Sequence, residues 1–172
     1  MGILPEIDRA WITMNETLYL WNYIEGLPNS FQTYQVGKDP IAYVGLVPAK
    51  PGIFVDTITH VLVICRTNTL ELVAISTSVT TPPGGGYPVR DLDIFDTGIS
   101  VSTDAQEFNS IASTPDGRVF LTGGRGIYEL IYQTKESWFS KQSYLINHSL
   151  TTIGGLLPSL LGSRPSGSPR PA

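Results

Sequence analysis

Asp91, Asp93 and Asp96 are the residues whose type and spacing come closest to a metal-binding site. Hard cations such as calcium bind where several carboxylate oxygens converge. These aspartates lack the glycine and the distal glutamate of a calcium loop, and Asp91 and Asp93 fall on the same face of a predicted strand. We therefore interpret the three residues as part of a solvated strand face.

Other residue types with catalytic or ligand-binding chemistry are sparse. The only histidines, His60 and His148, have no second histidine or cysteine at the short spacing that zinc requires. The serines include no nucleophile elbow, and the glycine-rich residues 123–126 precede a strand pattern, whereas a phosphate loop opens a helix. The sequence predicts no catalytic residue, no metal, no cofactor and no small-molecule substrate.

Residues 149–162 carry the sharpest physical signal in the chain. Wound as a helix, this segment gathers its six large aliphatic side chains within an arc of roughly 140°. The opposite face holds only serine, threonine and glycine, and an uncharged polar face of this kind is typical of helices that sense loose lipid packing on curved membranes. The predicted membrane-binding residues are Leu150, Ile153, Leu156, Leu157, Leu160 and Leu161.

The helical interpretation has one objection and one alternative. Pro158 removes a backbone hydrogen bond in mid-helix at about 3 kcal/mol, so we expect a kink or two short turns. Gly154 and Gly155 also disfavour a helix, so the segment should stay largely unstructured in water and become partly helical on a membrane. Alternatively, the leucines cover a neighbouring part of the fold or a neighbouring subunit.

The elements that would position this segment are strands. Threonine, valine, isoleucine, glycine and proline are frequent, which is the vocabulary of strands and turns. Three hairpins recur, over residues 9–23, 60–75 and 118–132, each with a polar or glycine turn between two apolar strands. Further strands are predicted at residues 41–47, 92–99, 108–113 and 142–146.

The repeated hairpins predict an all-β fold of about ten strands. One strand–hairpin–strand unit for about every 50 to 60 residues matches the four-stranded antiparallel blade of a β-propeller. The chain would hold two to three blades, an incomplete propeller, with a β-sandwich as the structural rival. We predict a partial propeller over residues 1–148, an amphipathic membrane-contacting loop over 149–161 and a disordered, low-complexity tail over 162–172.

Composition narrows the partners and the compartment. The net charge of −4 lacks the basic field that neutralises phosphates, so we expect no nucleic-acid partner. The single cysteine, Cys65, fits a reducing compartment. The sequence shows no secretion signal and no apolar run of the roughly 20 residues that a membrane-spanning helix needs, so any membrane contact would be peripheral.

Several runs resemble the N-terminal propeller of the large non-repetitive inner-ring nucleoporins, the nucleoporin 155/170 family. The similarity extends, in order, over most of residues 4–161. The runs that carry it are residues 5–11, 20–23, 44–54, 60–63, 117–121, 128–133, 138–140, 146–149 and 156–161.

The resemblance implies a structural constituent of the nuclear pore complex at the nuclear envelope. Members of that family have a seven-bladed propeller and an α-helical solenoid, support the curved pore membrane as a scaffold for nucleocytoplasmic transport, and bind inner-ring and linker nucleoporins. Their membrane-contacting loop corresponds to residues 149–161 here. The remaining blades and the solenoid are absent from this chain, and residues 162–172 depart from the family pattern. The alternatives are a soluble protein-interaction propeller and a fragment of a propeller hydrolase.

Overall fold

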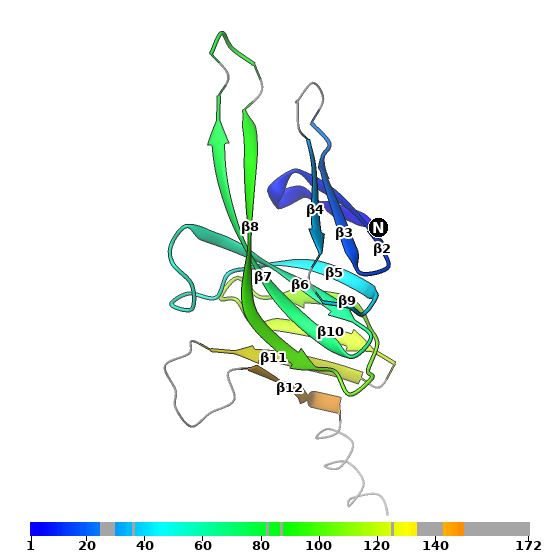
Figure 1. Cartoon of the computed structure of the whole chain (residues 1–172). Coiled ribbons are helices and arrows are strands. Elements are labelled where there is room, and N and C mark those ends of the chain that lie inside the picture. The colour runs from blue at the N-terminus through cyan, green and yellow to red at the C-terminus, as the bar shows by residue number, and fades with distance from the viewer. Residues whose placement is uncertain are drawn as a thin grey trace, which may run out of the picture.

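A computed structural model of the chain describes residues 1–24, 30–35, 37–81, 83–86, 88–124, 126–133 and 143–149. These residues form three antiparallel sheets of four strands, in which consecutive strands lie side by side (Figure 1). Blade 1 contains β1 (Gly2–Leu4), β2 (Arg9–Met14), β3 (Thr17–Asn22) and β4 (Phe31–Gln35). Blade 2 contains β5 (Ile41–Pro48), β6 (Ile58–Arg66), β7 (Thr69–Thr80) and β8 (Val89–Ser102). Blade 3 contains β9 (Phe108–Ser113), β10 (Val119–Gly123), β11 (Gly126–Tyr132) and β12 (Ser143–Asn147).

The architecture confirms the predicted all-β propeller fragment and corrects its strand count. The ten strands expected from the sequence are present, and β1 and β4 are two more. The short β1 has only three residues, and β4 reads Phe-Gln-Thr-Tyr-Gln, which lacks a run of apolar residues. The β-sandwich alternative is wrong, because the strands form three sheets and not two.

A single turn of 3-10 helix, η1 (Pro5–Ile7), joins β1 to β2. No helix in the described part of the chain is both long enough and apolar enough to cross a membrane.

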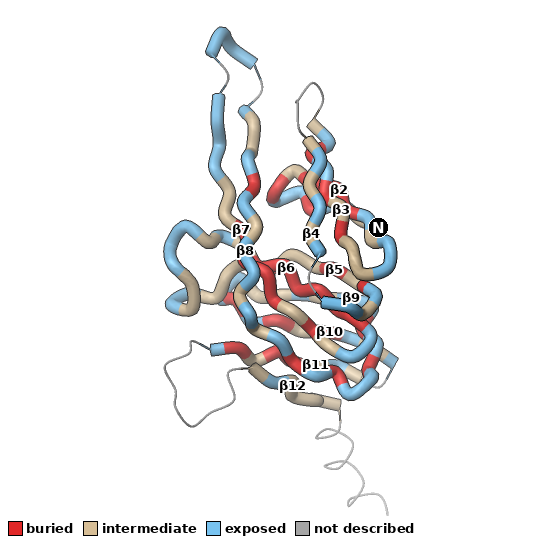
Figure 2. The backbone as a smooth tube through the Cα atoms, viewed as in Figure 1, coloured by how far each residue is buried: buried red, intermediate tan, exposed pale blue. Residues whose placement is uncertain are grey.

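Blade 2 lies between the other two blades and buries both of its faces (Figure 2). Along β6, Leu62 and Ile64 pack in the apolar cluster shared with blade 1. Val61, Val63 and Cys65 point to the opposite face and pack in the cluster shared with blade 3. Strand side chains alternate between faces, so a strand buried on both sides needs an unbroken apolar run, which is what residues 61–65 supply. Burial also raises the pKa of the Cys65 thiol to about 12.

The two long strands of blade 2 form a hairpin that extends beyond the rest of the fold (Figure 1). A β-bulge interrupts their pairing, because Leu72 pairs with Ile99 whereas Val73 pairs with Asp96. At the bulge, Thr97 Oγ1 donates to the carbonyl of Leu72 at 2.6 Å and Gly98 has a φ of 66°. Bulges of this kind bend a strand and increase its twist.

A buried arginine ties blade 1 to blade 2. Arg66 donates from Nη1 to the carbonyl of Asp39 at 2.6 Å and, more weakly, to the carbonyl of Glu16 at 3.5 Å. Its Nε donates to Glu71 Oε2 at 2.9 Å. Glu16 lies in the β2–β3 turn, so this one side chain fixes the turn of blade 1 against the end of β6.

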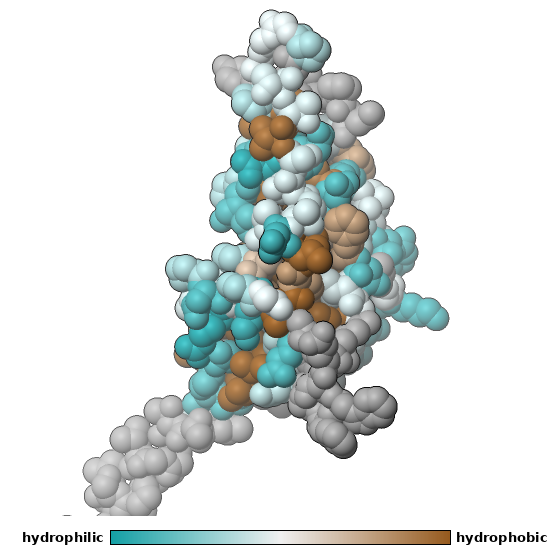
Figure 3. Space-filling model, turned by 90° about the vertical axis from the view of Figure 1, so that its left-hand side faces the viewer, coloured by the Kyte–Doolittle hydropathy of each residue, from teal (hydrophilic) through white to brown (hydrophobic). Residues whose placement is uncertain are grey.

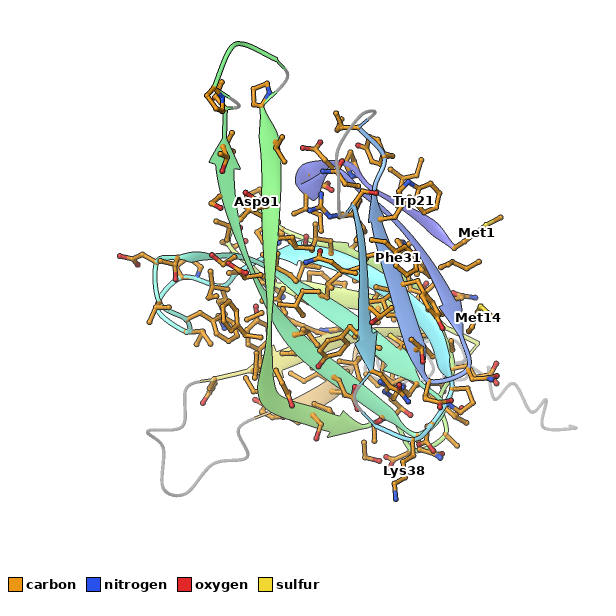
Figure 4. All side chains as sticks on the ribbon, turned by 45° about the horizontal axis from the view of Figure 1, so that its top comes forward. Met1, Met14, Trp21, Phe31, Lys38 and Asp91 are labelled. Atoms are coloured by element: carbon orange, nitrogen blue, oxygen red, sulfur yellow. The ribbon has the colours of Figure 1, made fainter. Side chains whose placement is uncertain are left out.

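The end blades each bury one face and expose the other. On blade 1 the outward face is apolar, with exposed side chains from Ile3, Ile12, Met14, Trp21 and Phe31. Figure 4 labels Trp21, Phe31 and Met14 on this sheet. The inward face of the same sheet supplies Leu18 and Leu20 to the core, so β3 alternates as an amphipathic strand should.

Candidate functional site

The predicted membrane-binding residues fall outside the part of the chain that the structure describes. Leu150, Ile153, Leu156, Leu157, Leu160 and Leu161 all follow Ser149, the last described residue. The membrane-contacting loop and the low-complexity tail therefore stay predictions. What the structure describes is the base of that segment, where the chain leaves β12.

The base of the segment begins as a helix. His148 and Ser149 have helical conformation directly after β12. Asn147 acts as the N-cap, because its Oδ1 accepts a hydrogen bond from the Ser149 amide at 2.9 Å. Ser149 Oγ in turn accepts from the Ile127 amide of β11 at 2.8 Å. Gly126 has a φ of 133°, and a Cβ atom there would collide with the Ser149 side chain, so this contact needs the glycine.

A charged cluster lies beside this base on the outward face of blade 3. Glu129 accepts two hydrogen bonds from Arg118, from Nε to Oε1 at 2.8 Å and from Nη2 to Oε2 at 3.0 Å. His148 Nε2 lies 2.9 Å from the same Oε2. The Glu129 side chain is only 8% exposed, whereas that of Arg118 is 50% exposed. The cluster therefore surrounds a buried carboxylate with two partners that reach solvent.

The hydrogen bonds of the cluster shift the pKa values of Glu129 and Arg118, and an aromatic ring packs against Arg118 and His148. Hydrogen bonds from Arg118 first, and then from His148, hold the pKa of the Glu129 carboxyl below its usual value despite burial. The pKa of Arg118 is raised, mainly by its hydrogen bond to Glu129. Phe120 completes the cluster, with the Arg118 guanidinium carbon 4.9 Å from its ring centre and the His148 ring centre 6.3 Å away.

The register of three strands brings these residues together. Across the sheet, Phe120 of β10 pairs with Glu129 of β11, and Glu129 pairs with Ile146 of β12. Arg118 lies two residues before Phe120 and His148 two residues after Ile146, so both share the face of Glu129 at diagonal positions. A turn closed by Gly123 and Gly126 sets the first of these registers, and it is the hairpin turn that the sequence predicted.

The sequence does not predict this cluster: it excludes His148 as a zinc ligand and indicates no role for Glu129. The contact between Arg118 and Glu129 could have been predicted from the turn. A hairpin turn at residues 124–125 puts Glu129 opposite Phe120 and diagonal to Arg118. The contribution of His148 depends on the pairing of β12, which follows residues 134–142 and has no turn signal to set its register.

A second feature is an apolar groove where blade 2 meets blade 3. It has a volume of about 470 Å³. Figure 3 shows apolar side chains gathered below the long hairpin on one side of the molecule. Val55 is 70% exposed and Phe95 is 50% exposed at this groove. Its lining residues are Ile53, Phe54, Val55, Thr57, Ile58, Ala74, Phe95, Asp96, Thr97, Ile99 and Gln133.

The three aspartates of β8 form no metal centre. Asp91, Asp93 and Asp96 are exposed, which confirms the predicted solvated strand face, and Asp91 lies on the β8 arm of the hairpin (Figure 4). Asp91 accepts a hydrogen bond from Thr80 Oγ1 at 3.0 Å, and Asp96 accepts one from the Gly98 amide at 2.9 Å. Within the described ranges, no three histidine, cysteine, aspartate or glutamate side chains group in a way that could hold a metal ion.

The chain is similar to one protein-family model and to several known proteins. A protein-family model described as Nup133 N terminal like matches residues 1–171. The chain is 38% identical over 164 residues to nucleoporin NUP170 of Chaetomium thermophilum, covering 94% of this chain and 11% of that protein. It is 35% identical to the probable nucleoporin C890.06 of Schizosaccharomyces pombe, covering 92% and 12%. It is 33% identical to Nup154 of Drosophila melanogaster, covering 94% and 11%. The chain thus spans about a tenth of the length of these relatives.

Among solved structures, the chain is similar to a crystal structure of the Nup170 N-terminal domain in complex with Nup53 from Chaetomium thermophilum. The TM-score is 0.75 at 36% identity, and the match covers 98% of this chain and 22% of that one. The three blades therefore have the arrangement of a part of that domain.

Proposed function

This chain belongs to the nucleoporin family described as Nup133 N terminal like, and from that premise we propose that it serves as a structural part of the nuclear pore complex at the nuclear envelope. Its relatives are nucleoporins and not enzymes, which supports a scaffold role in nucleocytoplasmic transport. The observation that carries the proposal is similarity over nearly the whole chain, in sequence and in fold. A fluorescently tagged full chain should concentrate at the nuclear rim, and a diffuse signal would contradict this placement.

The finer part of the proposal is that residues 149–161 contact the curved pore membrane. Support comes from the uncharged amphipathic pattern and from the capped helical start at Asn147, His148 and Ser149. The first turn of a helix is the costly one to form, so a start that the blade already holds lowers the ordering cost of the residues that follow.

The expected affinity is low and depends on lipid packing. Burying the six aliphatic side chains at about 1.5 kcal/mol each yields on the order of 9 kcal/mol before ordering and tethering costs remove much of it. Residues 149–162 contain no lysine or arginine, so attraction to anionic lipid adds little. Binding should therefore follow membrane curvature more than lipid charge.

Liposome flotation of the full chain tests the membrane contact. The wild type should float with small neutral vesicles and much less with large ones, and Leu156→Asp with Leu160→Asp should abolish flotation. A matched control, Thr151→Asp with Ser159→Asp, adds the same charges to the polar face and should retain binding. If the wild type ignores small vesicles, or the leucine variant floats equally well, the leucines pack against protein instead.

A second candidate function is the binding of a linker nucleoporin in the groove between blades 2 and 3. The observation that favours it is an apolar groove with Val55 and Phe95 exposed, in a chain whose structural relative was crystallised with Nup53. Apolar pockets of this size bind a few large side chains of a partner segment.

Isothermal titration calorimetry with a purified Nup53 fragment tests the groove. Val55→Asp should weaken binding at least tenfold, since it places a charge in an apolar contact. Val79→Asp is the matched control, because Val79 is also exposed but lies on the long hairpin away from the groove. Equal affinities for the two variants would rule out the groove as the binding site.

A further inference from the structure

We infer that Glu129 is a positioning residue that, through Arg118 and His148, holds the base of the 149–161 segment against blade 3 and thereby sets how that segment meets the membrane. The inference rests on the proposed membrane contact. Glu129 itself touches no lipid in this scheme, since it acts through the two residues that it binds.

Glu129 holds its two partners firmly. It is the one buried acidic residue in the described part of the chain. A buried carboxylate is unfavourable unless charged or polar donors satisfy its oxygens. Arg118 and His148 supply all three close contacts, with distances between 2.8 and 3.0 Å. Arg118 fixes the carboxylate from β10, and the carboxylate then fixes His148.

His148 is the first residue beyond the sheet. It follows β12 directly and begins the helical conformation that Asn147 caps. The next residue, Ser149, is tied to β11 by the Ile127 amide. His148 and Ser149 at the base of the segment are therefore both anchored to β11, at Glu129 and Ile127, and these anchors fix the direction in which the chain leaves the blade.

A second ion pair in the fold allows positioning to be distinguished from ordinary stabilisation. Blade 2 contains a second arginine–glutamate pair, in which Arg66 Nε donates to Glu71 Oε2 at 2.9 Å. The Arg66–Glu71 pair lies between blades 1 and 2, whereas the base of the segment is held on β11 of blade 3, so removing the charge of Glu71 weakens the fold without releasing His148. The variant Glu71→Gln is therefore the matched control for Glu129→Gln.

Hydrogen exchange of the full chain, read at the amides of Ile127 and Ser149, tests whether the anchor exists. Glu129→Gln should raise both exchange rates about tenfold, the effect of losing one hydrogen bond to a charged group, whereas Glu71→Gln should leave their ratio to other blade 3 amides unchanged. His148→Ala should behave like Glu129→Gln. His148→Gln should retain protection, because its amide nitrogen still donates to Glu129. Unchanged protection in Glu129→Gln would overturn the inference.

Flotation with small neutral vesicles tests the consequence. Glu129→Gln should lower the bound fraction several-fold relative to wild type and to Glu71→Gln, since the segment must then order itself on the membrane unaided. If Glu129→Gln floats as well as a binding wild type, the anchor is structural only and the positioning role is wrong. If the wild type does not float at all, the proposed membrane contact is wrong and the positioning role falls with it.

Discussion

Two arginine–glutamate pairs in this fold bury opposite partners: one buries the arginine and the other buries the glutamate. Between blades 1 and 2, the Arg66 side chain is 1% exposed and its partner Glu71 is 17% exposed. On the outward face of blade 3, Glu129 is the buried partner and Arg118 the exposed one. The pair distances are nearly equal, 2.9 Å and 2.8 Å. The difference lies in which charge is removed from water.

That difference decides what each pair can do. A buried guanidinium has several donors and no acceptor, so Arg66 also uses the carbonyls of Asp39 and Glu16 and fastens backbone to backbone. A buried carboxylate only accepts, so Glu129 must gather donors from side chains. Arg118 and His148 supply them, and both stay partly exposed. The first pair is a fixed structural connection, whereas the second holds a chain segment at the surface.

The largest expected effect comes from removing the buried guanidinium. Arg66→Ala leaves the Glu71 carboxylate and the Asp39 carbonyl without their donor, so we expect the free energy of unfolding to fall by about 3–5 kcal/mol. Urea denaturation monitored by circular dichroism measures it. Arg90→Ala, which breaks the partly exposed Arg90–Asp8 pair, is the control and should have a much smaller effect. Similar losses in the two variants would mean that burial does not distinguish these pairs.

Removing the buried carboxylate should cost less. Glu129→Gln loses the charge but keeps an oxygen that can accept from Arg118 or His148, and both partners can turn to solvent. We expect unfolding to become easier by about 1 kcal/mol, the net worth of a typical hydrogen bond. The same urea titration measures it. A loss as large as that of Arg66→Ala would show that blade 3 depends on the Arg118–Glu129 pair for its fold as much as blades 1 and 2 depend on Arg66.

Acid should erase the contribution of Glu129. Its folded pKa is depressed below the ordinary value of 4.5. The stability that it contributes is therefore fully present above about pH 4.5 and is lost as pH falls through the lower folded pKa. The difference in unfolding free energy between wild type and Glu129→Gln should be smaller at pH 3 than at pH 5. A difference that grows from pH 5 to pH 3 would contradict the assigned direction of the pKa shift.

The sequence sufficed for the fold because the strands of blade 2 and the three hairpins carry strong local signals. The apolar run at residues 61–65 marks a strand of the second hairpin, and the polar turn at Asn15 and Glu16 marks the first hairpin. Strand β4 escaped because its five residues have no apolar alternation, and it is held by pairing with β3. Tertiary pairing of this kind leaves no local pattern.

The candidate site could be predicted only in part. The amphipathic pattern that begins at Leu150 is local and was visible, whereas its anchor depends on residues far apart in the sequence. Glu129 and His148 are 19 positions apart and meet only through the pairing of β11 with β12. From the sequence, His148 could be considered only as a metal ligand. A single histidine beside a carboxylate is more often an ion-pair partner.

The smallest expected effect is a response to salt that the two pairs should not share. Arg118 is half exposed, so ions can screen its attraction to Glu129, and at about 1 M salt the screening length falls to roughly 3 Å. Arg66 is shielded by both blades and binds carbonyl groups as well as Glu71, so ions reach it poorly. Between about 0.05 M and about 1 M sodium chloride the Debye length falls from more than about 10 Å to about 3 Å. The destabilisation caused by Glu129→Gln should therefore be smaller in about 1 M than in about 0.05 M sodium chloride. The destabilisation caused by Arg66→Ala should be the same in both. Parallel urea titrations at the two salt concentrations measure this, and an equal salt response of the two variants would mean that Arg118 is as shielded from solvent ions as Arg66.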